Sequence, residues 1–103
     1  MLSPVRPLPN NITDSQRSIW YYTYILKSDK DNNFYTGTTL DLERRLNEHN
    51  AGTNFSTRHR RPFKLIYFEA CLKKDDAYRR ERYLKSTMGK RFLRTRLKGG
   101  LTG

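Results

Sequence analysis

Three apolar stretches separated by polar turns predict the strands of the chain. The run IWYYTYIL at residues 19–26 is β-branched and aromatic, which predicts a buried strand. The polar stretch at 28–33 predicts a turn into a second short strand, FYTGT at 34–38, so that the two strands form a hairpin. The run PFKLIYFEACL at 62–72 predicts a third strand. Because that run is almost continuously apolar, we expect helices to bury both of its faces.

Apolar positions at helical spacing predict a first helix after the hairpin, in the segment LDLERRLNEH. Thr38 or Thr39 is expected to cap its start, because a hydroxyl there can accept from the free backbone N–H groups, and Asp41 is expected in the first turn. Gly52 is expected to end the helix. Its inward face collects the residues at i, i+4 and i+7, which are Leu42, Leu46 and His49.

Two further helices are expected in the C-terminal part of the chain. Asp75 or Asp76 is expected to cap the second, which continues to about Ser86. Gly89 is expected to break the chain before a short, very basic helix at 90–98. That helix would bury its apolar side chains, which are Phe92, Leu93 and Leu97. The resulting order, ββαβαα, describes a small α+β domain.

The two ends of the chain differ from its middle. Residues 1–18 hold three of the four prolines and few apolar residues, which predicts a flexible N-terminal arm. Residues 99–103, GGLTG, are expected to form a frayed tail. A single folded domain over 19–98 is what a chain of 103 residues can accommodate.

The sequence also excludes several classes of protein. No apolar run approaches the roughly 18 residues of a membrane span, so we expect no membrane partner. The N-terminus lacks the apolar core of a secretory signal, which makes the cytoplasm the expected location. The single cysteine, Cys71, excludes an internal disulfide framework and a multi-cysteine zinc site.

The charge is concentrated in one half of the chain. The net charge is +11, and residues 58–103, with fifteen basic and four acidic residues, carry all of it. This asymmetry favours a polyanionic partner, with nucleic acid preferred over the alternative of a solvated helical face. The expected phosphate contacts are Lys85, Lys90, Arg91 and Arg94. Three loop cations either line the path of the nucleic acid or are simply solvated: Arg58, Arg60 and Arg61.

Five residues could together carry phosphodiester chemistry. The hairpin brings Tyr24 and Tyr35 near each other, and the helix after it presents Arg45 and His49 on one side because they lie four residues apart. Glu81 lies on the apolar side of its helix, where a carboxylate is costly unless it has a partner or a metal ion. Such a set offers phenols and an imidazole for moving protons and a guanidinium for phosphate oxygens.

Each of these residues also has a plain structural interpretation. The two tyrosines could be ordinary sheet aromatics, and His49 could pack on the inner face of its helix. Arg45 could be a surface residue. Glu81 could form an ion pair with Arg45 or Lys85.

The order of these motifs resembles a known family. Tyr22-Thr23-Tyr24, then Tyr35-Thr36-Gly37, then LDLERRLNEHN, is similar to the GIY-YIG nucleases, and above all to their small single-domain bacterial members. These are similar to the catalytic domain of the nuclease subunit of bacterial nucleotide-excision repair, so DNA repair is the setting that the resemblance implies. The strings FSTRHRRPFKLIYFEACL and AYRRERYLK extend the likeness over about residues 20–98.

The resemblance implies a small three-stranded, mainly antiparallel sheet flanked by helices, and a metal-dependent endonuclease that acts on nucleic acid, with DNA expected. It also implies catalytic roles for Tyr24, Tyr35, Arg45 and His49. Glu81 would bind the divalent ion, Mg²⁺ or Mn²⁺. Either tyrosine could help to activate water, with His49 as the relay, and the sequence leaves that choice open.

Two positions depart from the family pattern. Many members carry an asparagine where this chain has Leu93 or Arg96, and the repair enzymes carry a lysine where this chain has Thr38. The first departure keeps two other functions open. One is a non-catalytic nucleic-acid-binding module, and the other is a subunit that cuts only when a protein partner positions the DNA.

Overall fold

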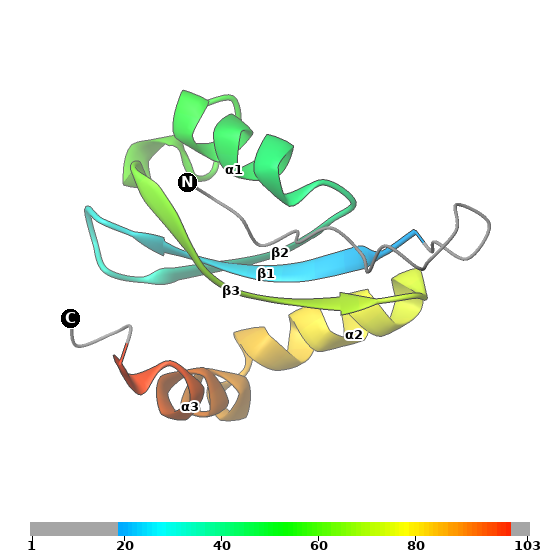
Figure 1. The fold of residues 1–103 in the computed structure, drawn as a ribbon. Coiled ribbons are helices and arrows are strands. Elements are labelled where there is room, and N and C mark those ends of the chain that lie inside the picture. The colour runs from blue at the N-terminus through cyan, green and yellow to red at the C-terminus, as the bar shows by residue number, and fades with distance from the viewer. Residues whose placement is uncertain (1–18, 100–103) are drawn as a thin grey trace.

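A three-stranded antiparallel sheet separates two helical layers (Figure 1). The computed structural model describes residues 19–99, so the predictions for 1–18 and for most of the tail lie outside the described part. The strands are β1 (Tyr21–Ser28), β2 (Phe34–Thr39) and β3 (Phe63–Cys71), in the spatial order β2-β1-β3. The predicted ββαβαα order and the α+β class are confirmed.

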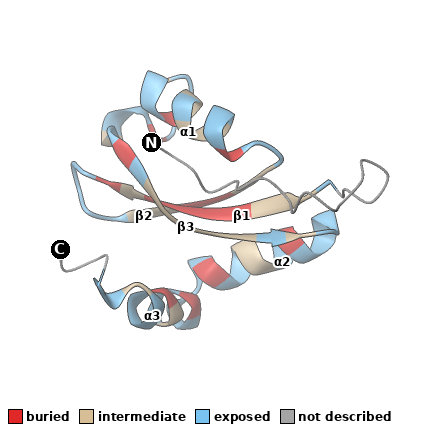
Figure 2. Cartoon of the chain, in the orientation of Figure 1, coloured by how far each residue is buried: buried red, intermediate tan, exposed pale blue. Residues whose placement is uncertain are grey.

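The central position of β1 explains how burial is distributed over the sheet. Thr23–Leu26 of β1 are all buried, whereas β3 is mostly half-buried (Figure 2). Helices lie on both faces of the sheet, as predicted, but β3 itself is only half-buried, which is less than its apolar run predicted (Figure 1). An apolar run indicates a strand, but only neighbours on both sides complete its burial, and β3 is an edge strand.

The alternation of side chains along β1 builds two separate cores. Tyr24 and Leu26 point to one face, where α1 (Leu42–Ala51) covers them together with Phe63. Ile25 points to the other face and packs under the two C-terminal helices, α2 (Lys74–Lys85) and α3 (Thr87–Arg96). Leu84 and Leu93 complete that second core. Figure 1 shows α1 on one side of the sheet and the other two helices on the opposite side.

Polar contacts fix α2 on the sheet. The buried Thr23 hydroxyl donates to the carbonyl of Ala77 at 2.8 Å. Arg80 forms a two-pronged ion pair with Glu69 of β3, at 2.8 and 2.6 Å, and this geometry suits a guanidinium beside a carboxylate. Within residues 19–99 no helix combines the length and apolar character needed to cross a membrane.

The helix starts differ from the predicted ones by a few residues. Asp41, not a threonine, caps α1, and its carboxylate accepts from the backbone N–H of Arg44 at 3.1 Å. Lys73 occupies the cap position of α2 without a side-chain bond. Asp75 and Asp76 lie in the first turn instead, where their negative charges interact favourably with the positive end of the helix dipole. Gly52, in the left-handed conformation at φ 81°, ends α1 as predicted.

The third helix begins before Gly89, so the prediction of a break at that glycine was wrong. Ser86 ends α2 and caps α3, with its hydroxyl oxygen accepting from the backbone N–H of Gly89 at 3.1 Å. Gly89 is buried inside α3, and a Cβ there would collide with the carbonyl of Tyr83 and lie 2.5 Å from Cα of Leu84. The glycine therefore allows close approach of two helices. The segment between α1 and β3 contains a short 3-10 helix at Arg58–Arg60.

The close approach at Gly89 can be tested by adding one methyl group. Gly89→Ala is expected to lower the free energy of unfolding by about 1–3 kcal/mol, because the added methyl group would collide with the backbone of Tyr83 and Leu84. Urea denaturation measures the change. Thr95→Ala, an exposed site on the same helix, is the control and should leave stability unchanged or slightly raised. Equal stability of the two variants would contradict the packing described.

Candidate active site

The site is built on the missing side chain of Gly37. Tyr24 of β1 pairs with Gly37 of β2, and a Cβ on the glycine would lie 2.5 Å from the Tyr24 hydroxyl. The phenol of Tyr24 therefore lies directly over Gly37, and a side chain at position 37 would leave no room for it. Tyr35, two residues before the glycine, points to the same face of the sheet. Its ring centroid is 6.3 Å from that of Tyr24.

Helix α1 supplies two partners to these rings. The Nε of Arg45 donates to the Tyr24 hydroxyl at 3.4 Å. The Nε2 of His49 lies 3.1 Å from the same oxygen, and the imidazole ring packs edge-on against Tyr35 at 4.7 Å between centroids. The structure thus brings together four of the five predicted site residues. We refer to Tyr24, Tyr35, Arg45 and His49 as the tyrosine cluster.

A buried threonine completes the hydrogen bonding of the tyrosine cluster. Arg45 can only donate, so the Tyr24 oxygen accepts from it and the phenol proton is free to go to His49. The other ring nitrogen of His49, Nδ1, lies 2.8 Å from the hydroxyl of Thr57, which is fully buried. This assignment gives a continuous chain of donors and acceptors from Arg45 through Tyr24 and His49 to Thr57.

Sequence reasoning missed Thr57 as a site residue. It belongs to the string FSTRHRRPF, which contributed to the family resemblance, but nothing in its local pattern distinguishes it from a loop threonine. Its contact with His49 exists only because the loop after α1 folds back onto that helix. The one available signal was the resemblance itself.

Burial sets the protonation of the tyrosine cluster. Loss of solvent raises the pKa of Tyr24 to about 12, against the hydrogen bond from Arg45, which lowers it. Burial, and then the positive charge of Arg45, lowers the pKa of His49 to about 4. The two shifts run in opposite directions. Tyr24 is therefore a neutral phenol and His49 a neutral imidazole at neutral pH.

Glu81 reaches the site from the opposite face of the sheet. Thr38 follows Gly37, so its side chain points toward α2, where its hydroxyl donates to Oε1 of Glu81 at 2.5 Å. Lys85 donates to the other carboxylate oxygen at 2.9 Å. The negative charge of Glu81 is among the causes that raise the pKa of Tyr24, so the two groups interact across β2. Of the two expected ion-pair partners, Lys85 is present, whereas Arg45 pairs with Glu48 at 2.9 Å.

The donor set at Glu81 suits a hard divalent cation that keeps most of its water. Within residues 19–99 no group of three or more His, Cys, Asp or Glu side chains is arranged to hold a metal. Mg²⁺ commonly binds through one or two carboxylates, with waters and substrate phosphates as its other ligands. The Glu81 side chain is 20% exposed, so its oxygens are open to solvent on one side. A single-carboxylate site fits these residues, and a closed protein cage does not.

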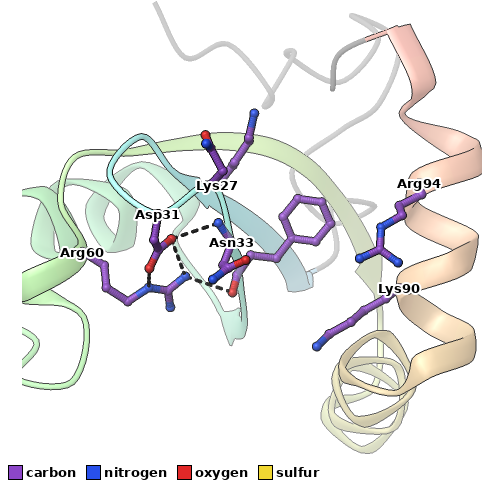
Figure 3. Close-up of a pocket in the computed structure, with 8 residues that line it drawn as sticks. Lys27, Asp31, Asn33, Arg60, Lys90 and Arg94 are labelled. Atoms are coloured by element: carbon purple, nitrogen blue, oxygen red, sulfur yellow. Dashed lines mark hydrogen bonds and ion pairs between the residues drawn. The ribbon is translucent and has the colours of Figure 1, made fainter. Parts of the chain in front are cut away.

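The predicted phosphate-binding cations lie in different places. Arg60, Lys90 and Arg94 line one cavity between the β1–β2 hairpin and α3 (Figure 3). Arg58 stacks on the ring of Phe55 at 4.5 Å, and Arg61 donates to the carbonyl of Arg58 at 2.8 Å. The remaining two are Lys85, beside Glu81, and Arg91, exposed on α3 outside the cavity.

Comparison with known proteins decides the family. Residues 20–95 match the family model described as the GIY-YIG catalytic domain. The chain belongs to the GIY-YIG family. The matched residues include the whole tyrosine cluster and Glu81. Membership of this family implies a nuclease with a nucleic-acid substrate.

The curated relatives are small GIY-YIG proteins that carry only a family number as a name. A UPF0213 protein of Clostridium perfringens is 49% identical over 65 residues, which is 62% of this chain and 69% of that protein. A UPF0213 protein of Staphylococcus haemolyticus is 45% identical over 67 residues, covering 64% and 80% of the two chains. The solution NMR structure of a UPF0213 protein from Bacillus halodurans is 37% identical, covers 74% of this chain and 83% of that one, and has a TM-score of 0.47.

The structure shows what surrounds the residues at the two departures from the GIY-YIG pattern. Leu93 is fully buried in the core under α2 and α3, so that position cannot present a polar group to a substrate. Arg96 is exposed on α3. Thr38 stands where the repair enzymes carry a lysine, and here its hydroxyl holds Glu81. The sequence indicated Thr38 only as a departure, because its contact joins residues 43 positions apart.

The buried neutral imidazole of His49 predicts a loss of stability in mild acid. Its pKa is about 4 in the folded protein against 6.5 in an exposed histidine, so the unfolded chain takes up a proton that the folded chain refuses. The stabilising contribution is complete above pH 6.5 and is lost as the pH falls toward 4. The free energy of unfolding should drop by about 2 kcal/mol between pH 7 and pH 5.

Urea denaturation across that pH range measures the drop, and NMR of the imidazole protons locates the titration of His49. Carboxyl groups take up protons mainly below about pH 5, so the chosen window isolates the histidine. His59→Gln removes the other histidine and should leave the drop in place. An unchanged free energy of unfolding down to pH 5, or an imidazole titration near 6.5, would contradict the assignment.

Proposed function

We propose that this protein is a divalent-metal-dependent endonuclease that hydrolyses phosphodiester bonds of nucleic acid, with DNA as the expected substrate. The observation that carries the proposal is the tyrosine cluster. Arg45 and His49 bond to the same phenol oxygen, at 3.4 and 3.1 Å, beside a second tyrosine and across one strand from Glu81. A packing cluster needs neither the arginine nor the carboxylate there. Their joint presence in a GIY-YIG domain supports hydrolysis.

The two tyrosines differ in what they can reach. Tyr24 is 2% exposed, and its hydroxyl already bonds to Arg45 and His49. Tyr35 is half-buried, and its hydroxyl makes no hydrogen bond to any residue within 19–99. In our proposal Tyr35 is therefore the tyrosine that meets the attacking water. Tyr24 is a positioning residue, which holds the guanidinium of Arg45 and the imidazole of His49 in place.

Arg45 is the proposed contact to the phosphate. Its Nε bonds to Tyr24 and one Nη bonds to Glu48, and these two contacts fix the plane of the guanidinium. The side chain is 34% exposed, so its remaining N–H groups face solvent. A planar, permanently charged donor held in this way stabilises charge that develops on phosphate oxygens in the transition state.

Glu81 is the proposed ligand of the divalent ion, held in orientation by Thr38 and Lys85. When bound, the ion would supply positive charge to the phosphate as it is attacked. Lys85 pairs with one carboxylate oxygen, and Thr38 holds the other one. Lys85 would be available to contact a phosphate if a divalent ion were bound to Glu81.

A second candidate function is a basic nucleic-acid-binding module, either one that never cleaves or one that cleaves only with a protein partner. The burial of Leu93 favours it, because the asparagine common in the family has no counterpart at that position. The basic C-terminal half would serve binding equally well in either case.

Cleavage of labelled supercoiled, single-stranded and branched DNA, with Mg²⁺ or Mn²⁺, tests the proposal. Glu81→Gln keeps the size of the side chain and a carbonyl oxygen for Thr38 but removes the charge. It is expected to slow cleavage by at least about a hundredfold, since charge stabilisation by the ion is lost. Glu43→Gln, which removes an exposed carboxylate from α1, is the matched control and should cut like the wild type.

Two results would overturn the endonuclease. Binding without metal-dependent cleavage of any of these DNAs would favour the binding module or the partner-dependent subunit instead. Cleavage that is equal in Glu81→Gln and Glu43→Gln would show that the ion, and the site, lie elsewhere.

A further inference from the structure

A basic cavity of about 710 Å³ lies between the β1–β2 hairpin and α3 (Figure 3). Its size is within the range of small-molecule binding sites. Lys90 and Arg94 extend into it from α3, and Arg60 and Asp31 form the opposite wall. The other lining residues come from the hairpin: Lys27, Asn32, Asn33 and Phe34.

The cations of this cavity fall into two kinds. Arg60 is already committed, since it pairs with Asp31 at 2.7 Å and donates to the carbonyl of Phe34 at 3.3 Å. It braces the wall of the cavity. Lys27, Lys90 and Arg94 form no ion pair with any residue in 19–99. Three positive charges around one space repel each other, and a bound anion would relieve that repulsion.

The rest of the lining suits a nucleobase. Phe34 is half-buried, and its ring packs against the core of Ile25, Leu84 and Leu93, which fixes it in place. A fixed aromatic ring at a basic surface is a stacking platform for an unpaired base. The amides of Asn32 and Asn33 can both donate and accept, as the edges of bases require.

The cavity and the proposed active site are linked by one strand, β2, which contributes a residue to each. Phe34 and Thr38 point to the same face of this edge strand, about 14 Å apart by the rise of a strand, and Thr38 holds Glu81. Tyr35 follows Phe34 and points to the opposite face. A strand of nucleic acid that turns around the β2 edge at Tyr35 could therefore place one nucleotide in the cavity and a phosphate near Glu81.

We propose that this cavity is a subsite for one unpaired nucleotide of the substrate, with its phosphate on Lys90 and Arg94 and its base on Phe34. The inference rests on the proposed function and specifies the kind of substrate that the enzyme prefers. A base inside a duplex is stacked and cannot enter such a space, so the preferred substrate has a single-stranded segment next to the cleaved bond.

Fluorescence anisotropy with a labelled single-stranded DNA and a blunt duplex of the same sequence, in EDTA, tests the subsite without requiring cleavage. Arg94→Ala is expected to weaken single-strand binding about tenfold, the value of one charge-assisted contact. It should also reduce the salt slope by about 0.7. Phe34→Leu, which keeps an apolar side chain for the core, should weaken single-strand binding by about fivefold or more.

Arg82→Ala is the matched control, because it removes the same charge from the last turn of α2 at an exposed site outside the cavity. It should change single-strand affinity by less than about twofold. Thermal melting of each variant separates lost binding from lost folding. Loss of single-strand affinity confined to Arg94→Ala and Phe34→Leu, with duplex affinity unchanged, supports the subsite.

Equal losses in Arg94→Ala and Arg82→Ala, or equal losses on single strand and duplex, would overturn the subsite in favour of general attraction between charges. These outcomes are independent of the cleavage test. An inactive protein with the expected binding pattern would refute only the endonuclease, and an active one with equal losses would refute only the subsite.

Discussion

The hydroxyl of Tyr24 joins the sheet to α1 at a point where three elements meet. It lies over Gly37, accepts from Arg45 and bonds to His49, which in turn bonds to Thr57 of the following loop. All of these groups are fully or partly buried, so each bond replaces water that is no longer available. Removal of the Tyr24 hydroxyl would cost both Arg45 and His49 a buried hydrogen-bond partner. Beside the apolar packing of Leu42 and Leu46, this one oxygen links α1 to the sheet and helps to orient the guanidinium of Arg45.

In the proposed mechanism, the same burial separates the groups that hold the site together from the groups that react. Tyr24 and His49 are neutral and enclosed, which suits them to hold their neighbours but not to exchange protons with solvent. Tyr35 and Arg45 lie at the edge of the cluster and keep free donors and acceptors. Because β2 is an edge strand, Glu81 on the opposite face of the sheet and the tyrosine cluster lie on the two sides of an exposed strand. The site is thus assembled around a strand rather than within a pocket.

Local sequence patterns predicted the elements of this fold, whereas contacts across the fold set their ends. The hairpin that pairs Tyr24 with Tyr35 and the four-residue spacing of Arg45 and His49 are local patterns, and they predicted which of these residues lie near each other. The start of α3 depends on the Ser86 hydroxyl, and Gly89 is needed because the backbone of Tyr83 lies close to it. A glycine in the sequence indicates neither of these contacts. The half-burial of β3 follows from strand order. The contacts of Thr38 and Thr57 likewise join segments that the chain brings together only when folded.

The division of labour between the two tyrosines is the central claim, and single-turnover cleavage by Tyr35→Phe and Tyr24→Phe, with urea denaturation of each, tests it directly. Tyr35→Phe should lose at least about a hundredfold in rate with the free energy of unfolding unchanged, since its hydroxyl has no partner in the described chain. Tyr24→Phe should lose about 1–3 kcal/mol of stability, because Arg45 and His49 then lose a buried partner. An unchanged rate in Tyr35→Phe, together with loss of cleavage at full stability in Tyr24→Phe, would contradict the account.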